Sequence, residues 1–194
     1  MTERLDRQIA FLNEADKLKS IMRGTTLCDG SRAENSAEHS WHLTLYALVL
    51  ADQAGPGVDI NRVIKMLILH DLVEIDAGDN PIFGDYDAAA MAAQEQIAAD
   101  RIFGLLPNDL RDDLRAVWEE FEAAQSPSAQ FAKSLDRFQP PMQNLESGGG
   151  SWTEYNVSEA QIEEKVGRKI AIGAPTLWAY AKTRIAVFFA GINA

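Results

Sequence analysis

The sequence predicts an all-α protein of one domain, built from roughly seven to nine helices. Apolar residues recur at the three- and four-residue spacing of helices along almost the whole chain. Residues that start and stop helices bracket these segments, and no alternating apolar and polar run is long enough to predict a strand. A length of 194 residues fits a single domain with a sizeable core.

In the first part of the chain the pattern predicts a helix, a loop and a second helix. Residues 23–35 (RGTTLCDGSRAEN) read as a loop that contains Gly and Asp. Asn35, followed three residues later by Glu38, is typical of a helix start, and Gly55-Pro56-Gly57 ends that helix. The first helix spans residues 3–22, whose apolar stripe consists of Leu5, Ile9, Leu12, Leu18 and Met22.

The middle of the chain predicts one buried helix and two that follow it. Residues 59–77 are apolar on most sides, which favours a central, buried position. After the turn-rich segment AGDNPIFGD, further helices are expected over residues 86–104 and 108–124.

The last third of the chain predicts three more helices. One begins at Ser126-Pro127 and should stop or kink at Pro140-Pro141, because proline breaks the hydrogen-bond ladder. The segment SGGGS over 147–151 is expected to be a flexible loop. The final helices begin at Ser158 and Pro175. We expect helices 158–194 to pack on the rest of the domain or on a partner.

Charge and composition argue against several classes of protein. The formal net charge is −11, so the surface lacks the basic stripe that nucleic-acid binding requires. The single cysteine, Cys28, cannot form an internal disulfide and reads as an ordinary loop thiol. No segment has the pattern of a membrane span or a signal peptide. We therefore expect a cytoplasmic protein that binds neither nucleic acid nor membranes.

One short stretch, ILHDLVEIDAGD at 68–79, carries many ionisable side chains at the end of the buried helix. His70 and Asp71 are adjacent, and Glu74 lies about one turn further on, over the same turn as both. A metal ion beside this turn would find an imidazole and two carboxylates. The alternative is an exposed acidic edge with a core histidine. The apolar surroundings favour the metal, because a buried carboxylate is costly unless it is paired or metal-bound.

The other two histidines, His39 and His42, lie on the preceding helix. His39 shares the face of Leu43 and Tyr46, which should point at the core, and His42 lies about 60° round the helix. Either could be a metal ligand or a core histidine with satisfied hydrogen bonds. Imidazole and carboxylate ligands together suit a first-row transition metal more than calcium.

Three segments, ENSAEHSWH, ILHDLVEIDAGD and KSLDR, follow one another in a characteristic order. In this order they resemble the HD-domain metal-dependent phosphohydrolases, over roughly residues 5–145. The resemblance implies a single compact HD-domain helical bundle with its metal core at about 30–140. It also implies one divalent cation (Mn, Co, Fe, Ni, Zn or Mg). The implied ligands are His39, His70, Asp71 and Asp136.

The branch that looks nearest contains small HD proteins such as the bacterial 5′-deoxynucleotidases, and it implies further roles. Glu74 would exchange a proton with the attacking water or the leaving oxygen. Asp79 would contact the substrate sugar or orient the water. Arg23 and Arg32 are candidate phosphate contacts, although ordinary solvated surface arginines would look the same.

This sequence departs from the pattern of the branch just after Arg23. The branch carries a Trp closely after the arginine, whereas here Gly24 follows Arg23 and the next Trp is Trp41. The resemblance therefore leaves the preference for deoxyribose open.

The resemblance implies a phosphomonoesterase that acts on (deoxy)nucleoside 5′-monophosphates by a metal-activated water. Relatives in this branch are commonly homodimers, so a homodimer is expected as well. Three alternatives stay open. They are a hydrolase of signalling nucleotides or phosphodiesters, a di-iron oxidase that would need more histidines, and a non-catalytic, metal-containing ligand sensor.

Overall fold

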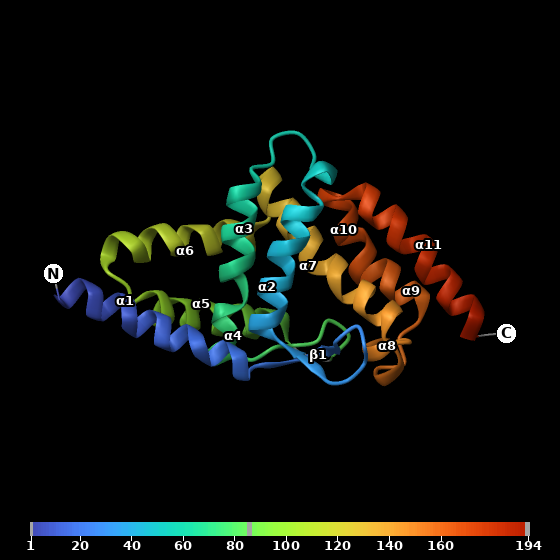
Figure 1. Cartoon of the computed structure of the whole chain (residues 1–194), viewed down its shortest axis with the longest axis horizontal. Coiled ribbons are helices and arrows are strands. Elements are labelled where there is room, and N and C mark those ends of the chain that lie inside the picture. The colour runs from blue at the N-terminus through green and yellow to red at the C-terminus, as the bar shows by residue number, and fades with distance from the viewer. Residues whose placement is uncertain (1, 85–86, 193–194) are drawn as a thin grey trace.

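Three helices meet at the centre of the protein, and their contacts organise the rest of the chain (Figure 1). The computed structural model describes residues 2–84 and 87–192. In it, α2 (Ser36–Val49) packs on α3 (Ile60–Leu69), and both pack on the long helix α7 (Pro127–Glu146). The prediction of an all-α helical bundle is confirmed. The core where these helices meet includes Leu43, Ala47, Val63, Met66, Leu67, Phe131 and Leu135.

The remaining elements form two groups on either side of the central helices (Figure 1). On one side lie α1 (Thr2–Ala15), α5 (Ala88–Phe103) and α6 (Asn108–Ala123). On the other side lie α8 (Gly150–Glu154), α9 (Glu159–Ile162), α10 (Arg168–Gly173) and α11 (Pro175–Ile192), and α11 packs on α7 and α10. The short turns and connecting helices are η1 (Asp16–Ser20), η2 (Ala51–Gln53), η3 (His70–Val73), α4 (Glu74–Ala77) and the π-helical turn η4 (Glu163–Gly167).

The predicted helix starts are borne out by side-chain caps. The Asn35 side chain accepts a hydrogen bond from the Glu38 amide, and the Glu38 carboxylate accepts one from the Asn35 amide. The Ser126 hydroxyl accepts from the amide of Ala129. These local signals were readable because each requires only residues three positions apart.

The loop predicted over residues 23–35 is wrong in part, because its ends form a small antiparallel sheet. Strand β1 (Met22–Thr26) pairs with β2 (Ala33–Asn35), with Met22 opposite Asn35 and Thr26 opposite Ala33. The first helix accordingly ends before Met22, at Ala15 and the turn η1. Strands this short carry too few residues for an alternating pattern to be visible.

Other predicted boundaries also shift. The buried helix expected over 59–77 is interrupted by the 3-10 turn η3 and resumes as α4. Pro140-Pro141 do not stop α7, which continues to Glu146 because packing on both sides holds it. The segment 147–151 is a turn with positive φ at Gly148, Gly149 and Gly150 that leads into α8. Residues 86 and 193–194, which belong to two predicted segments, lie outside the described residues.

Two further observations bear on the surface. Leu5, Ile9 and Leu12 of the predicted apolar stripe are exposed, whereas Phe11 and Leu18 are the buried residues of this segment. Among the described residues, no helix combines the length and the apolarity needed to cross a bilayer.

Candidate metal centre and active site

Three side chains from distant parts of the chain converge on one buried point. His39 comes from the first turn of α2, His70 from the start of η3 and Asp136 from the middle of α7. One ligand atom from each lies within 4.8 Å of the others. The His39 Nε2 atom is 3.1 Å from Asp136 Oδ1, and His70 Nε2 is 3.7 Å from the same oxygen.

Asp71 lies directly beside this cluster. Its Oδ1 atom is 2.9 Å from His70 Nε2, and its Oδ2 atom accepts a hydrogen bond of 2.9 Å from Arg23 Nη1. His70 and Asp71, called the doublet below, are adjacent in sequence. Both side chains nevertheless reach the same point, where α3 ends. The four residues predicted as metal ligands lie together.

The imidazoles are oriented in the way that metal ligation requires. His70 Nδ1 lies 2.9 Å from the carbonyl oxygen of Leu67, so this nitrogen donates to the backbone and Nε2 is the atom that faces the carboxylates. His70 Nε2 is buried and makes no well-aligned hydrogen bond among the described residues, although Asp71 Oδ1 lies 2.9 Å from it. A buried ring nitrogen that faces two carboxylates without a well-aligned hydrogen bond fits a divalent cation placed between them.

His39 is held by a corresponding pair of contacts on its other ring nitrogen. Its Nδ1 atom lies 3.1 Å from Gln139 Oε1 and 3.3 Å from Glu34 Oε2, so Nε2 is left facing Asp136. A carboxylate or amide oxygen behind a histidine fixes the tautomer and strengthens the ring as a ligand. The donor set of two imidazoles and two carboxylates suits a first-row divalent metal.

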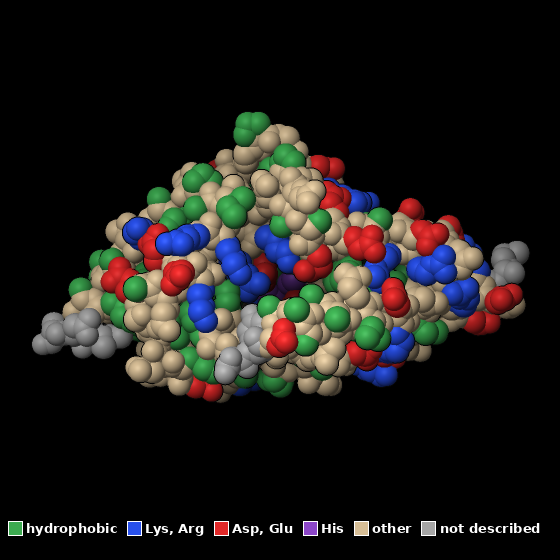
Figure 2. Space-filling model, turned by 180° about the vertical axis from the view of Figure 1, so that it is seen from behind, with side chains coloured by type: hydrophobic (Ala, Val, Ile, Leu, Met, Phe, Trp, Pro, Cys, Tyr) green, Lys and Arg blue, Asp and Glu red, His purple; other side chains and the backbone are tan. Residues whose placement is uncertain are grey.

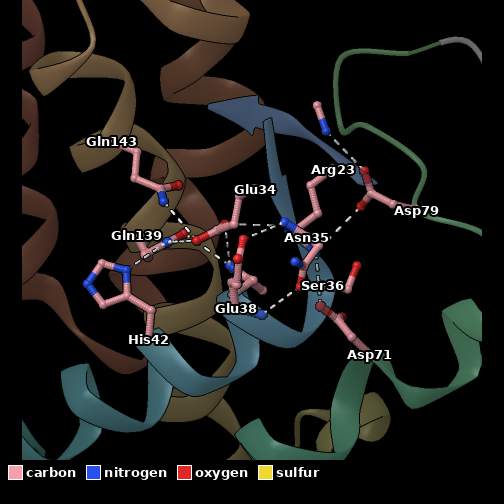
Figure 3. A network of polar contacts seen from close by, with 12 residues as sticks. Arg23, Glu34, Asn35, Ser36, Glu38, His42, Asp71, Asp79, Gln139 and Gln143 are labelled. Carbon is pink, nitrogen blue, oxygen red and sulfur yellow. Dashed lines mark hydrogen bonds and ion pairs between the residues drawn. The ribbon is translucent and has the colours of Figure 1, made fainter. Parts of the chain in front are cut away.

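Glu34 is a site residue that the sequence did not reveal. It is 1% exposed, and its Oε1 atom accepts hydrogen bonds from Gln139 Nε2 (3.1 Å) and Gln143 Nε2 (2.9 Å). Figure 3 shows the Glu34 carboxylate between these two glutamines on α7 and Arg23 on β1. No spacing rule points to it, because the two glutamines that hold it lie more than one hundred residues away in sequence.

Arg23 lies inside the site, surrounded by acids. Its Nη1 atom is 2.9 Å from Asp71, 3.5 Å from Asp79 and 3.7 Å from Glu74. Its Nε atom is 3.9 Å from Glu34. Burial acts to lower the pKa of Arg23, but the surrounding carboxylates outweigh it and raise the pKa above its usual value. The guanidinium is therefore already engaged with protein carboxylates, which compete with a substrate phosphate for it.

The two predicted catalytic acids line the same pocket. Ser36 Oγ donates a hydrogen bond of 2.5 Å to Glu74 Oε2, and the Gly24 amide donates one of 3.3 Å to Asp79 Oδ2. Burial, together with the nearby charge of Asp71, raises the pKa of Glu74 well above its ordinary value. Burial likewise raises the pKa of Asp79. Both acids are thus biased toward holding a proton.

The ligand carboxylates behave in the opposite way. Burial acts to raise the pKa of Asp71, but the charges of His70 and Arg23 outweigh it and hold the pKa at about 2. Burial also opposes ionisation of Asp136, yet Arg137 and a hydrogen bond to His39 keep its pKa well below the usual range. Conversely, although burial acts to lower the pKa of His70, Asp71 and Asp136 raise it to about 10. The cluster favours a bound positive charge.

A pocket of about 280 Å³ opens onto this cluster. Its wall includes Lys133 and Arg137 of α7 as well as the acids, and Figure 2 shows basic side chains gathered around a hollow in which a histidine is visible. Arg137 Nε is 3.6 Å from Asp136 Oδ2, which is its one ion pair within the described part of the chain. Positive groups at the mouth suit an anionic substrate in an otherwise acidic protein.

Arg32 is not brought to this pocket, and the geometry does not support its predicted contact with phosphate. It is exposed and donates two hydrogen bonds, of 2.8 and 2.7 Å, to the Glu38 carboxylate. Glu38 also caps α2, so the pair stands outside the site on the helix start. Nothing in the residue spacing could distinguish the surface position of Arg32 from the buried position of Arg23.

A family model described as HD domain matches residues 15–178. The chain belongs to the HD domain family. The match covers all four predicted ligands and extends into α11.

Similar proteins agree with this assignment. The chain is 29% identical over 160 residues to a protein of Danio rerio named 5′-deoxynucleotidase, covering 79% of this chain and 78% of that protein. It is 25% identical over 167 residues to a 5′-deoxynucleotidase of Photorhabdus temperata, covering 82% and 84% of the two chains. A solved structure described as a predicted metal-dependent phosphohydrolase of Magnetospirillum magnetotacticum has a TM-score of 0.90 and 43% identity, covering 97% of this chain and 96% of that one. Family and relatives together support a hydrolase.

Proposed function

We propose that this HD-domain protein is a metal-dependent phosphohydrolase that releases phosphate from (deoxy)nucleoside 5′-monophosphates. The observation that carries the proposal is the convergence of two imidazoles and two carboxylates, in which the buried Nε2 of His70 faces the carboxylates without a well-aligned hydrogen bond. The names of the relatives support the substrate class, and the cationic mouth of the pocket supports an anionic substrate.

His39, His70, Asp71 and Asp136 would hold one divalent cation. Such a cation, when bound, supplies a lower pKa for water and offsets the charge on phosphoryl oxygens. The two histidines present their Nε2 atoms, because Nδ1 of each is engaged elsewhere.

Glu74 is the residue we assign to proton transfer. It lies in the turn after the doublet, lines the pocket and is fixed by the Ser36 hydroxyl. A raised pKa makes the Glu74 carboxylate a stronger base, so it can accept a proton from the attacking water and return it to the leaving oxygen. Asp79, anchored to the Gly24 amide, would contact the substrate sugar or orient the water.

The phosphate is assigned to the cationic side chains of α7. Arg137 and Lys133 line the pocket beside Asp136, and Arg137 is only loosely paired. Arg23 is assigned a different part, since it neutralises Asp71, Asp79 and Glu74 and keeps these acids together. The phosphate contact predicted for Arg23 thus becomes a contribution to charge balance in our proposal.

A phosphate-release panel tests the proposal. Ribo- and deoxyribonucleoside 5′-monophosphates, and bis(4-nitrophenyl) phosphate as a phosphodiester, would be incubated with Mn²⁺, Co²⁺, Zn²⁺ or Mg²⁺, and in parallel with a chelator. We expect release with at least one metal and none with the chelator. Nucleotide binding without phosphate release would favour a ligand sensor, and cleavage of phosphodiesters alone would favour a phosphodiesterase. Either result would contradict the proposal.

A further inference from the structure

Besides the acids and the basic side chains, the pocket has a wall that is aromatic and apolar. It is formed by Pro81, Ile82 and Phe83 after α4 and by Trp152 and Tyr155 at α8. A site that only had to hold a phosphate and a metal would have no use for this surface, because neither ligand has an apolar face.

Trp152 gives this wall a rigid base. It is 3% exposed and packs against two aromatic rings of α11, with ring-centroid distances of 5.6 Å to Phe188 and 5.8 Å to Phe189. Tyr155, one turn further along, is 39% exposed and yet lines the pocket. Tyr155 therefore has a surface that is free to contact a ligand, whereas most of Trp152 is used in the core.

Tyr155 lies next to the acids of the site. A Cβ atom at Gly24 would stand 3.6 Å from Tyr155 Oη and 3.3 Å from Pro81 Cγ, so the wall contacts β1 directly after Arg23. The Gly24 amide donates a hydrogen bond to Asp79. The tyrosine hydroxyl therefore lies beside the residue that holds the Asp79 carboxylate. The space beside Gly24 is thus filled from α8 and the segment after α4, and not from β1 itself.

The two sets of lining side chains come from different elements. His70, Asp71, Asp136, Lys133 and Arg137 come from η3 and α7, whereas the aromatic and apolar set comes from α8 and the segment after α4. A molecule with a phosphate at one end and a flat apolar ring at the other could contact both sets. Aromatic side chains bind bases by stacking, with little dependence on which base is present.

We propose that Tyr155 is a specificity-determining residue that stacks on the base of a nucleotide whose phosphate faces the metal cluster. This inference rests on the proposed function and adds to it the part of the substrate that the protein recognises. The tyrosine hydroxyl is not required for stacking, so Tyr155→Phe should behave like the unchanged protein. Tyr155→Ala removes the ring and leaves the catalytic acids and metal ligands in place.

The test compares substrates that have a base with substrates that lack one. Steady-state kcat and KM would be measured for 2′-deoxyadenosine 5′-monophosphate and for 2-deoxyribose 5-phosphate, using the metal that supports the highest rate. Stacking on one base is lost in Tyr155→Ala, so KM for the nucleotide should rise roughly 5- to 100-fold. The KM for the sugar phosphate and both kcat values should stay within about twofold, since no ring contact is made there.

Tyr180→Ala is the matched control. Tyr180 is a tyrosine of similar exposure, 50%, on α11, and it lines a different groove. It should leave both KM values unchanged, as should Tyr155→Phe. Equal changes for the two substrates in Tyr155→Ala, or no change for either, would overturn the inference while the hydrolase proposal stands.

A binding measurement separates the two proposals if turnover is absent. Calorimetric titration with the nucleotide and with the sugar phosphate, in the presence of Mn²⁺, would give both dissociation constants without catalysis. Weaker binding of the nucleotide alone in Tyr155→Ala would support the role of Tyr155 even where the proposed function had failed. Unchanged nucleotide binding in that variant would overturn it.

Discussion

His39 and His42 stand three residues apart on α2, and yet they lie in two different environments. His39 is fully buried beside Asp136, with Gln139 and Glu34 behind its ring. His42 is half-buried and faces a groove of about 780 Å³ between α2, α7 and α11, where burial lowers its pKa. Gln139 lies between them, 3.1 Å from His39 Nδ1 and 3.3 Å from His42 Nδ1.

The long helix α7 shows the same division. Asp136 points into the acidic cluster, whereas Phe138, Met142 and Glu146 line the apolar groove. The pocket and the groove therefore both border α7, and each receives side chains from a different face of that helix. The difference teaches that residue type alone does not define a metal ligand. A histidine becomes a candidate ligand where its position around the helix points it toward carboxylates from other elements.

The largest expected effect comes from exchanging one histidine at a time. His39→Ala removes a proposed ligand, so the protein should retain no metal after dialysis, and phosphate release should fall to background. His42→Ala should keep the metal and most of the rate, because its ring faces the groove. Metal content per chain by mass spectrometry and phosphate release check both variants. Equal losses of metal and of phosphate release in the two variants would contradict the different roles assigned to His39 and His42.

Glu74→Gln separates proton transfer from metal binding. The amide cannot accept the proton of the attacking water, so kcat should fall by about 10²- to 10⁴-fold. The metal content should not change, because Glu74 is not among the proposed ligands. Glu146→Gln, in the apolar groove, is the control and should leave kcat unaltered. A parallel loss of metal would mean that Glu74 is itself a ligand.

These site predictions show which information the sequence carries. His70, Asp71 and Glu74 could be grouped because they lie within about one turn and because an apolar helix leads into them. Asp136 depended on the resemblance, since its neighbours Lys133 and Arg137 favoured a surface ion pair. That resemblance supplied an ordered pattern over distant segments, which no local spacing provides.

What the sequence could not provide depends on tertiary contacts. Glu34 becomes a partner of His39 only when β2 approaches α7. Arg23 and Arg32 look alike in sequence, but one is enclosed by acids and the other pairs with Glu38 at the surface. The sheet of β1 and β2 was missed because two strands of five and three residues carry too short a pattern.

A smaller effect is expected for the residue behind His39. Glu34→Gln keeps the size of the side chain and removes the negative charge that supports the imidazole, so metal affinity should fall about 10- to 100-fold. Titration with Mn²⁺, followed by electron paramagnetic resonance, measures this change. Glu146→Gln again serves as the control at a carboxylate outside the site. An unchanged Mn²⁺ affinity in Glu34→Gln would show that the Glu34 charge does not support His39 as a ligand.

The pH dependence of metal binding gives the most gradual effect. Without metal, Asp71 and Asp136 raise the pKa of His70 to about 10, so the ring holds a proton at neutral pH that a metal must displace. With a pKa of about 2, Asp71 is ionised throughout this range and contributes no proton. Affinity for Mn²⁺ should therefore rise with pH, by about tenfold per unit between pH 6 and 8. A flat or falling profile would contradict the charge arrangement.

The central claim is that His39, His70, Asp71 and Asp136 share one ion. A crystal grown with Mn²⁺ and measured at the manganese absorption edge tests it directly, because the anomalous signal locates the metal without assumptions about the ligands. We predict a single peak within bonding distance of Nε2 of both histidines and of both carboxylates. A map with no peak between these four side chains, or with manganese bound only elsewhere, would contradict the account.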